Sequence, residues 1–137
     1  MRILTALDGS EGAIRALRFA IDVAQKWGAE LHSVSIEEIA RHDGAVLPVS
    51  DESEWGDSTF APAIRAAQEN ARKAGISLQP HVIIGHEVKA VVQFIESSRF
   101  DLLVVGFVGQ TAYSRHVMGG TAFGLVQHAP CPVLVVK

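Results

Sequence analysis

The stretch that decides the fold reads DLLVVGFVG over residues 101–109 and, nine residues later, GGT over residues 119–121. A short apolar run that ends in glycine is typical of a central parallel strand covered on both faces, so residues 101–105 are predicted to form a buried strand. Thr121 then opens an apolar segment, residues 122–126, which predicts the start of a helix. Glycines between a strand end and a helix N-terminus let the backbone approach an anion closely.

This arrangement predicts a loop that holds the phosphates of a nucleotide. It differs from the commonest phosphate loops, because it lacks the Gly-Lys-Ser/Thr ending of a P-loop and the Gly-x-Gly-x-x-Gly spacing of a dinucleotide site. The alternative is that the glycines only make a tight turn between a strand and a helix. Spacing alone leaves both interpretations open.

Apolar strands alternate with amphipathic helices along the rest of the chain. Strands are predicted at residues 3–7, 30–36, 78–84 and 133–136. Ser10 is expected to cap a first helix that Gly28 ends, and Ser58 or Thr59 to cap a second that Gly75 ends. A third helix follows His86.

Residues 37–58 break the pattern, since they combine turn-forming residues with the isolated aromatic Trp55. About twenty residues without periodicity usually form a functional or a mobile loop in a small domain. We interpret the segment as a flap beside the ligand edge of the sheet. The alternative is an insertion without a role.

Strict alternation of strands and helices requires right-handed crossovers and a mainly parallel sheet. We therefore predict an α/β fold of the Rossmann-like kind, an open five-stranded parallel sheet in the order 3-2-1-4-5 with helices on both faces. This order places Pro80 on an edge strand, where a missing ladder donor is tolerated. The order itself comes from requiring the strands that end near Asp8 and Gly106 to be neighbours, so that one ligand can touch both at the switch point where open α/β sheets bind ligands.

Composition narrows the possible functions. The chain has 137 residues, 20% of them charged, and a formal net charge of −3. The length predicts a single domain over residues 1–137, and the absence of a basic cluster disfavours nucleic acid as a partner. No apolar run approaches the ~18 residues of a membrane span and no leader resembles a signal peptide, so a cytoplasmic protein without membrane contact is expected.

Other reactive residue types lack a convincing pattern. The six histidines show no metal-ligand spacing on one helix face, so we expect scattered surface histidines and no metal site. Cys131 lies between two prolines. It is the single cysteine of the chain, so it cannot form an internal disulfide, and we assign no partner base that would activate its thiol. Arg115 and His116, in the nine-residue spacer, either meet a phosphate or are solvated. No catalytic triad or carboxylate pair can be placed, so no catalytic residue is assigned and slow hydrolysis of a bound nucleotide is the most we expect.

Two motifs in this chain resemble those of a known family. The pattern Gly-x2-Gly-x9-Gly, followed by HAPCPVLVV over residues 128–136, resembles the carboxy-terminal signature of the universal stress protein family. The opening ALDGSE, residues 6–11, is similar to that family's first strand and turn. The resemblance covers essentially the whole chain and is weakest over residues 38–60.

The resemblance implies a regulatory module that binds ATP, with or without Mg²⁺, or a related adenine nucleotide. It implies that Asp8 lies against the adenosine part and that Ser35 offers backbone groups to the adenine edge. The nucleotide-binding residues implied in this way are Ala6, Asp8, Ser35, Gly106, Gly109, Gly119, Gly120, Thr121 and Ala122. It also implies a homodimer joined through the final strand, and an unidentified protein partner that senses the bound nucleotide.

One position departs from the family pattern. Nucleotide-binding members usually carry Ser or Thr after the third glycine, whereas this chain has Gly120 there and the hydroxyl follows one residue later, at Thr121. The alternative function is therefore a dimeric stress or interaction protein of the same fold that does not bind nucleotide.

Overall fold

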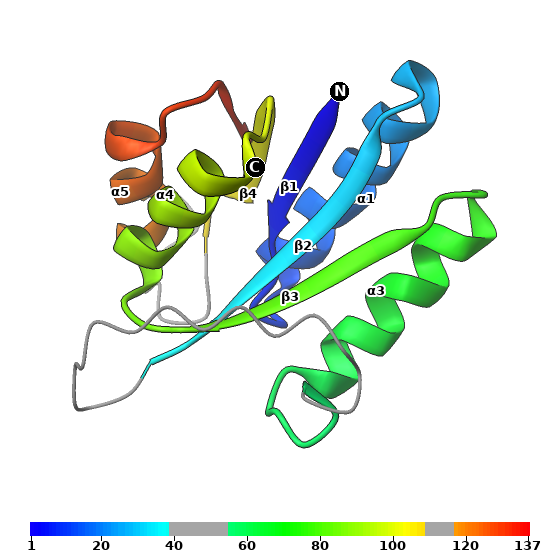
Figure 1. The fold of residues 1–137 in the computed structure, drawn as a ribbon, viewed down its shortest axis with the longest axis horizontal. Coiled ribbons are helices and arrows are strands. Elements are labelled where there is room, and N and C mark those ends of the chain that lie inside the picture. Colours follow the sequence, from blue (N-terminus) through cyan, green and yellow to red (C-terminus); the bar gives the residue numbers. More distant parts are fainter. Residues whose placement is uncertain (39–54, 109–116) are drawn as a thin grey trace.

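The structure, a computed structural model, describes residues 1–38, 55–108 and 117–137. Five parallel strands form one sheet in the order β3-β2-β1-β4-β5, as the sequence predicts (Figure 1). The strands are β1 (Arg2–Ala6), β2 (Glu30–Glu37), β3 (Leu78–Ile84), β4 (Leu102–Gly106) and β5 (Val133–Val136). The strand that contains Pro80 lies at one edge, which confirms its predicted place.

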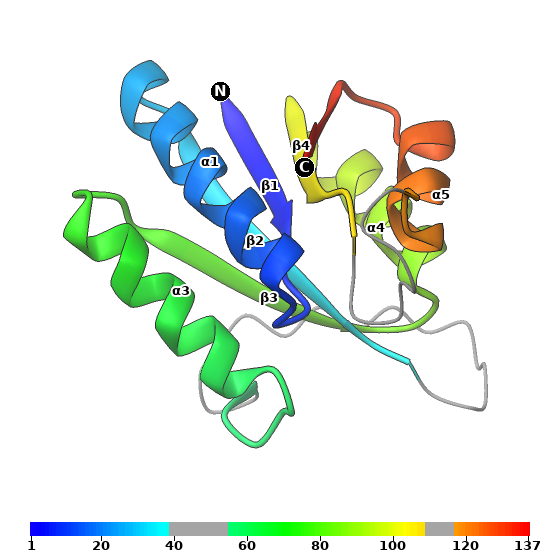
Figure 2. The same cartoon turned by 180° about the vertical axis from the view of Figure 1, so that it is seen from behind.

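Helices cover both faces of the sheet, in agreement with the predicted architecture. They are α1 (Glu11–Trp27), α3 (Ala61–Lys73), α4 (Glu87–Ser98) and α5 (Gly120–His128). Helices α1 and α3 lie on one face and α4 and α5 on the other (Figures 1 and 2). Each face has its own apolar core, because alternate strand residues point to opposite sides of a sheet. In the described part of the chain, no helix has the length and apolarity that crossing a bilayer requires.

The ends of α1 follow the sequence signals. Ser10 Oγ accepts a hydrogen bond from the backbone N–H of Ala13 at 3.1 Å, which satisfies a donor that the helix leaves unpaired. Gly28 ends the helix with φ of 62°, in the left-handed region that glycine adopts without strain. Both predicted boundaries are confirmed.

The start of α3 differs from the prediction, since the N-cap is Phe60 and no side chain caps the helix. Ser58 Oγ instead accepts from the N–H of Phe60 at 3.2 Å and donates to the Glu37 carboxylate at 2.5 Å. The predicted capping by Ser58 or Thr59 is therefore wrong. The Ser58 side chain instead links Glu37, at the end of β2, to Phe60, the residue before α3.

Trp55 is a core residue with only 2% of its surface exposed. It packs within the apolar cluster of α1 and α3, and the guanidinium of Arg65 lies 5.6 Å from the centre of its ring. The sequence pattern treats Trp55 as an isolated aromatic in an aperiodic segment, and that interpretation is wrong for this residue. The predicted flap lies mostly in residues 39–54, outside the described residues.

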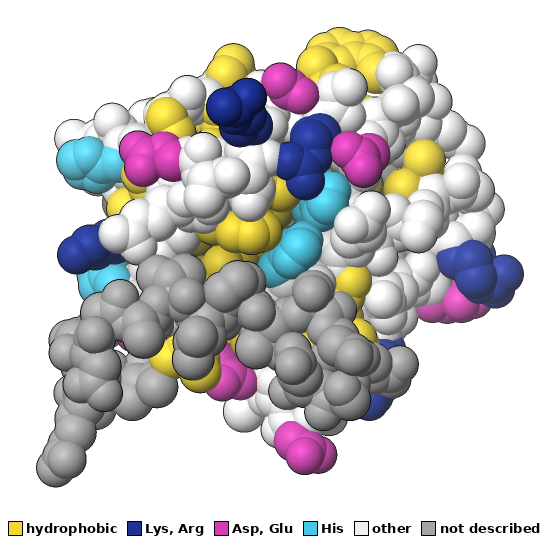
Figure 3. All heavy atoms as spheres, viewed as in Figure 1, with side chains coloured by type: hydrophobic (Ala, Val, Ile, Leu, Met, Phe, Trp, Pro, Cys, Tyr) yellow, Lys and Arg dark blue, Asp and Glu magenta, His cyan; other side chains and the backbone are white. Residues whose placement is uncertain are grey.

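The expectation of scattered surface histidines is also wrong for two of them. His32 on β2 is buried, and its Nδ1 lies 2.9 Å from Nε2 of His81 on β3. Phe94 packs against His81 and Phe100 against His32, and on this face histidine side chains lie beside hydrophobic ones (Figure 3). The pair forms because β2 and β3 are neighbours, which local spacing does not reveal. Among the described residues, no group of three His, Cys, Asp or Glu side chains could hold a metal ion.

Candidate functional site

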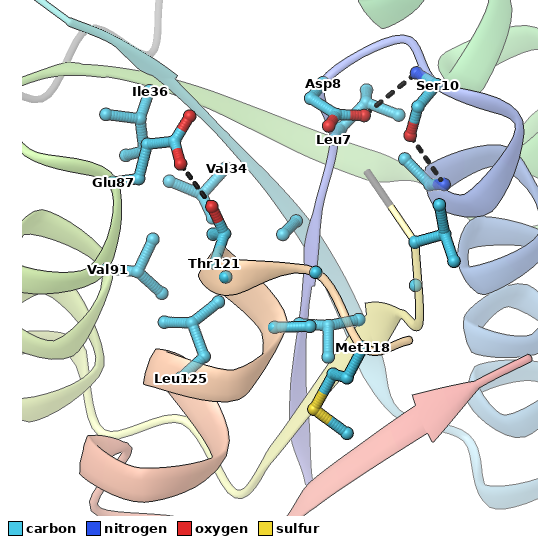
Figure 4. A pocket seen from close by; sticks show the side chains of 18 of the residues that line it. Leu7, Asp8, Ser10, Val34, Ile36, Glu87, Val91, Met118, Thr121 and Leu125 are labelled. Carbon is cyan, nitrogen blue, oxygen red and sulfur yellow. Dashed lines mark hydrogen bonds between the residues drawn. The ribbon is translucent and has the colours of Figure 1, made fainter. Parts of the chain in front are cut away.

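A cavity of about 500 Å³ opens at the carboxyl ends of the strands, where the strand order reverses between β1 and β4 (Figure 4). Open α/β sheets bind their ligands at this switch point. The predicted site residues that line the cavity are Ala6, Asp8, Gly106, Gly119, Gly120, Thr121 and Ala122. The structure thus brings together residues that are more than a hundred positions apart in the chain.

Ser35 and Gly109 differ from these residues. The hydroxyl of Ser35 is buried and donates to the carbonyl oxygen of Leu7 at 2.7 Å, so its side chain fixes the end of β1 against β2. Its strand neighbours Val34 and Ile36 line the cavity in its place. Gly109 lies outside the described residues, and so do Arg115 and His116.

Asp8 is held at the start of α1. Its Oδ1 accepts a hydrogen bond from the N–H of Ser10 at 2.9 Å, and Ser10 in turn caps the helix. Leu7 continues the backbone pairing beyond β1, since its N–H donates to the carbonyl of Val34 at 2.9 Å. This local network fixes the carboxylate at one side of the cavity (Figure 4).

Gly12 is a structural part of the site that the sequence analysis does not identify. A Cβ built on Gly106 would lie 2.6 Å from the carbonyl carbon and oxygen of Gly12, and one on Gly12 would collide with the carbonyl of Val108. The first turn of α1 therefore packs directly on the backbone that leaves β4. This close approach explains two glycines by packing, whereas a Cβ on Gly120 meets nothing within 4 Å.

The N-terminus of α5 faces the cavity without a capping side chain. Its N-cap is Gly119, which has no side chain, and no capping hydrogen bond from a side chain is formed there. The amides of a first helical turn have no partner within the helix, and the helix dipole adds positive potential there. Gly119, Gly120 and Thr121 line the cavity, so this end of α5 can accept an anionic group.

The wall of the cavity beside the N-terminus of α5, across from Asp8, is mainly apolar. The side chains that form it come from β2, α4 and α5 and are Val34, Ile36, Val91 and Leu125. Val34 and Ile36 are alternate residues of β2 and point to the same side of the sheet, so strand periodicity could have identified them. A pocket with an apolar wall and a polar end suits a ligand that has a flat ring and an anionic group.

Glu87 is the polar residue of this wall that the sequence analysis misses. It is the first residue of α4, and its carboxylate accepts a hydrogen bond from the hydroxyl of Thr121, the second residue of α5 (Figure 4). Thr121 therefore uses its hydroxyl proton within the protein. Among the described residues that line the cavity, the charged ones are Asp8 and Glu87, and none is basic.

Comparisons with known proteins agree with this architecture. The model of the universal stress protein family matches residues 1–137. A universal stress protein of Methanocaldococcus jannaschii is 28% identical over 138 residues, covering 99% of this chain and 81% of that protein. A universal stress protein of Thermus aquaticus is 31% identical over 144 residues, covering 98% of this chain and 97% of that protein.

Solved structures show the same fold. Universal stress protein UspA from Lactobacillus plantarum superposes with a TM-score of 0.83 at 24% identity, covering 100% of this chain and 97% of that one. A universal stress protein in complex with cAMP gives 0.76 at 22% identity, with 100% and 97% covered. One from Archaeoglobus fulgidus in complex with dAMP gives 0.68 at 20% identity, with 100% and 98% covered. Because the family model matches the chain along its whole length, this chain belongs to the universal stress protein family.

Proposed function

We propose that this protein is a regulatory module that binds an adenine nucleotide in the cavity at the end of β1 and β4. The observation that carries the proposal is the combination of an apolar wall with the uncapped N-terminus of α5 in one cavity. An apolar slot suits a flat base, and unpaired helical amides suit a phosphate. The cAMP and dAMP complexes of family members support this choice of ligand.

The apolar wall and the adjoining N-terminus of α5 suggest an orientation for the ligand. The base would lie between Val34, Ile36 and the side chains of α4 and α5, near the backbone of Ser35. Asp8 would accept hydrogen bonds from ribose hydroxyls, because a carboxylate is an acceptor only. The phosphate would then meet the backbone amides of Gly120 and Thr121. Gly106 lines the cavity beside them.

ATP, with or without Mg²⁺, is the finer form of this proposal. Mg²⁺ is usually held by one or two carboxylates together with phosphate oxygens and water. Asp8 supplies a carboxylate at the cavity, and the ligand would supply the phosphate oxygens. A partner protein would recognise the nucleotide-bound form. No residue is assigned a catalytic role.

A specific observation favours a second candidate function. Gly120 offers no hydroxyl, and the hydroxyl of Thr121 is already bonded to Glu87. A member of the family that has lost nucleotide binding, and acts as a dimeric interaction protein, would tolerate both features. Binding measurements distinguish the two functions.

The test is isothermal titration calorimetry with adenosine, AMP and ATP, the last with and without Mg²⁺. The matched variant is Gly120→Trp, because a Cβ at Gly120 meets nothing within 4 Å and Gly120 lines the cavity that the indole ring would occupy. Gln127→Trp, on the exposed surface of the same helix, is the control. The proposal predicts binding to the native protein and to the control, and its loss in Gly120→Trp. Absence of binding by all three ligands to the native protein would favour the interaction protein.

A further inference from the structure

The hydrogen bond between Glu87 and Thr121 joins the first turns of α4 and α5 across the cavity wall. Thr121 is the second residue of α5, so its backbone amide is among those that an anion at this helix end would use. A phosphate bound there would lie close to the Glu87 carboxylate, because that carboxylate already touches the Thr121 side chain. Two negative charges at this separation repel one another.

The repulsion grows with the charge of the ligand. Adenosine carries no phosphate and does not experience it, whereas AMP and ATP bring increasing negative charge to the same helix end. Asp8 lines the other side of the cavity, and no basic residue lies among its described lining residues. The attraction of the helix dipole falls off within the first turn, so it does not grow with additional phosphates.

We propose that Glu87 is a specificity-determining residue that lowers the affinity of this cavity for adenine ligands as their phosphate number increases. The ligand class favoured in the absence of Mg²⁺ is then the nucleoside and its monophosphates over the triphosphate. This inference rests on the proposed function, since it assumes that the cavity binds adenine nucleotides. It adds a residue and a direction of selectivity that neither the glycine motif nor the fold supplies.

The experiment compares native protein, Glu87→Gln and Glu87→Lys by calorimetry with adenosine, AMP and ATP, in EDTA at low ionic strength. Glutamine keeps the shape and an acceptor for Thr121 while it removes the charge, and lysine reverses the charge. Glu96→Gln makes the same change on the exposed surface of α4 and is the matched control. Circular dichroism melts of each variant verify that the fold is retained.

The expected result is a stepwise rise in the ratio of ATP affinity to adenosine affinity from Glu to Gln to Lys. Each step should be at least about threefold, the size of one interaction between unit charges at short range in a solvated site. The rise should shrink at high salt, and Glu96→Gln should leave the ratio unchanged. An unchanged ratio in Glu87→Gln and Glu87→Lys, or weaker ATP binding in either, would overturn the inference while the proposed function stands. Failure of all ligands to bind the native protein would overturn the proposed function and this inference with it.

Discussion

Gly106 at the end of β4 lies against the backbone of Gly12 in α1, so closely that a Cβ on Gly106 would stand 2.6 Å from the Gly12 carbonyl. Backbone cannot move aside as a flexible side chain can. Gly106→Ala should therefore destabilise the protein by about 1–3 kcal/mol, the usual cost of overpacking. The measurement is the free energy of unfolding in urea.

Gly120→Ala is the matched control for this prediction, because a Cβ there meets nothing within 4 Å. Alanine also costs less backbone entropy than glycine in a helix, so this variant should be neutral or slightly stabilised. Equal loss of stability in the two alanine variants would contradict the packing argument.

The departure from the family pattern at Gly120 gives a prediction about affinity. Because the Thr121 hydroxyl is bonded to Glu87, a new hydroxyl at position 120 should provide a phosphate contact that the native protein lacks. Gly120→Ser should tighten AMP or ATP binding by about 1.5–3 kcal/mol, the value of a hydrogen bond to a charged group. Gly120→Ala should give no such gain. If Thr121→Ala weakened binding by the same amount instead, Thr121 would already make the phosphate contact.

The histidine pair predicts a pH dependence of stability. Burial, the neighbouring His32 and the charge of Arg2 lower the pKa of His81 to about 4, and burial chiefly lowers the pKa of His32. The unfolded chain binds protons near pH 6.5, so it gains protons before the folded protein does. The contribution of the two histidines to the free energy of unfolding is therefore fully present above about pH 6.5, and it is lost as the pH falls from there towards the pKa values of the folded state.

Urea unfolding between pH 7.5 and 5 measures this dependence. His81→Phe should flatten the profile, because the variant keeps the ring contact with Phe94 and removes the titrating group. His128→Gln, at the exposed end of α5, should change the profile less. A profile that keeps its full slope in His81→Phe would show that other groups cause the acid sensitivity.

We propose dimerisation through β5, which lies at the open edge of the sheet beside β4. The carbonyl of Pro132 accepts a hydrogen bond from Leu103 of β4, and that of Val136 accepts one from Phe107, just after β4. The alternation of a parallel ladder therefore turns the backbone groups of Val133 and Val135 outward. An apolar edge of this kind is an aggregation hazard unless it is covered, and a two-fold partner covers it.

Val135→Pro should therefore dissociate the dimer without breaking a bond to β4, whereas Val135→Thr keeps the donor and should remain dimeric. Light scattering at micromolar concentration measures both. A native mass near 14.7 kDa would refute dimerisation, and a dimer that survives the proline would place the interface elsewhere.

The sequence predicted the fold well because its signals are local. Each strand is a short apolar run, and the glycine at position 28 ends α1 by its own backbone preference. The strand order was predicted by requiring the strands that end near Asp8 and Gly106 to be neighbours. In the structure both residues line the same cavity.

The missed features depend on contacts between distant segments. In the sequence, Glu87 is an ordinary acidic residue at a helix start, and only the packing of α5 against α4 brings Thr121 beside it. His32 and His81 become a pair only through the pairing of β2 with β3. Nothing in the sequence distinguishes Gly12 from any other helical glycine, because its importance lies in its contact with the end of β4. Trp55 belongs to no periodic apolar pattern in the sequence, although it packs in the core.

Nucleotide binding in the cavity is tested most directly by two-dimensional ¹H–¹⁵N NMR during a titration with AMP. Binding in the cavity predicts saturable shifts of the surrounding backbone amides, strongest at Gly106 and Gly120 and at Val34 on β2, with little change at the exposed surface of α3. Unchanged spectra at millimolar AMP, or saturable shifts confined to residues away from the cavity, would contradict it.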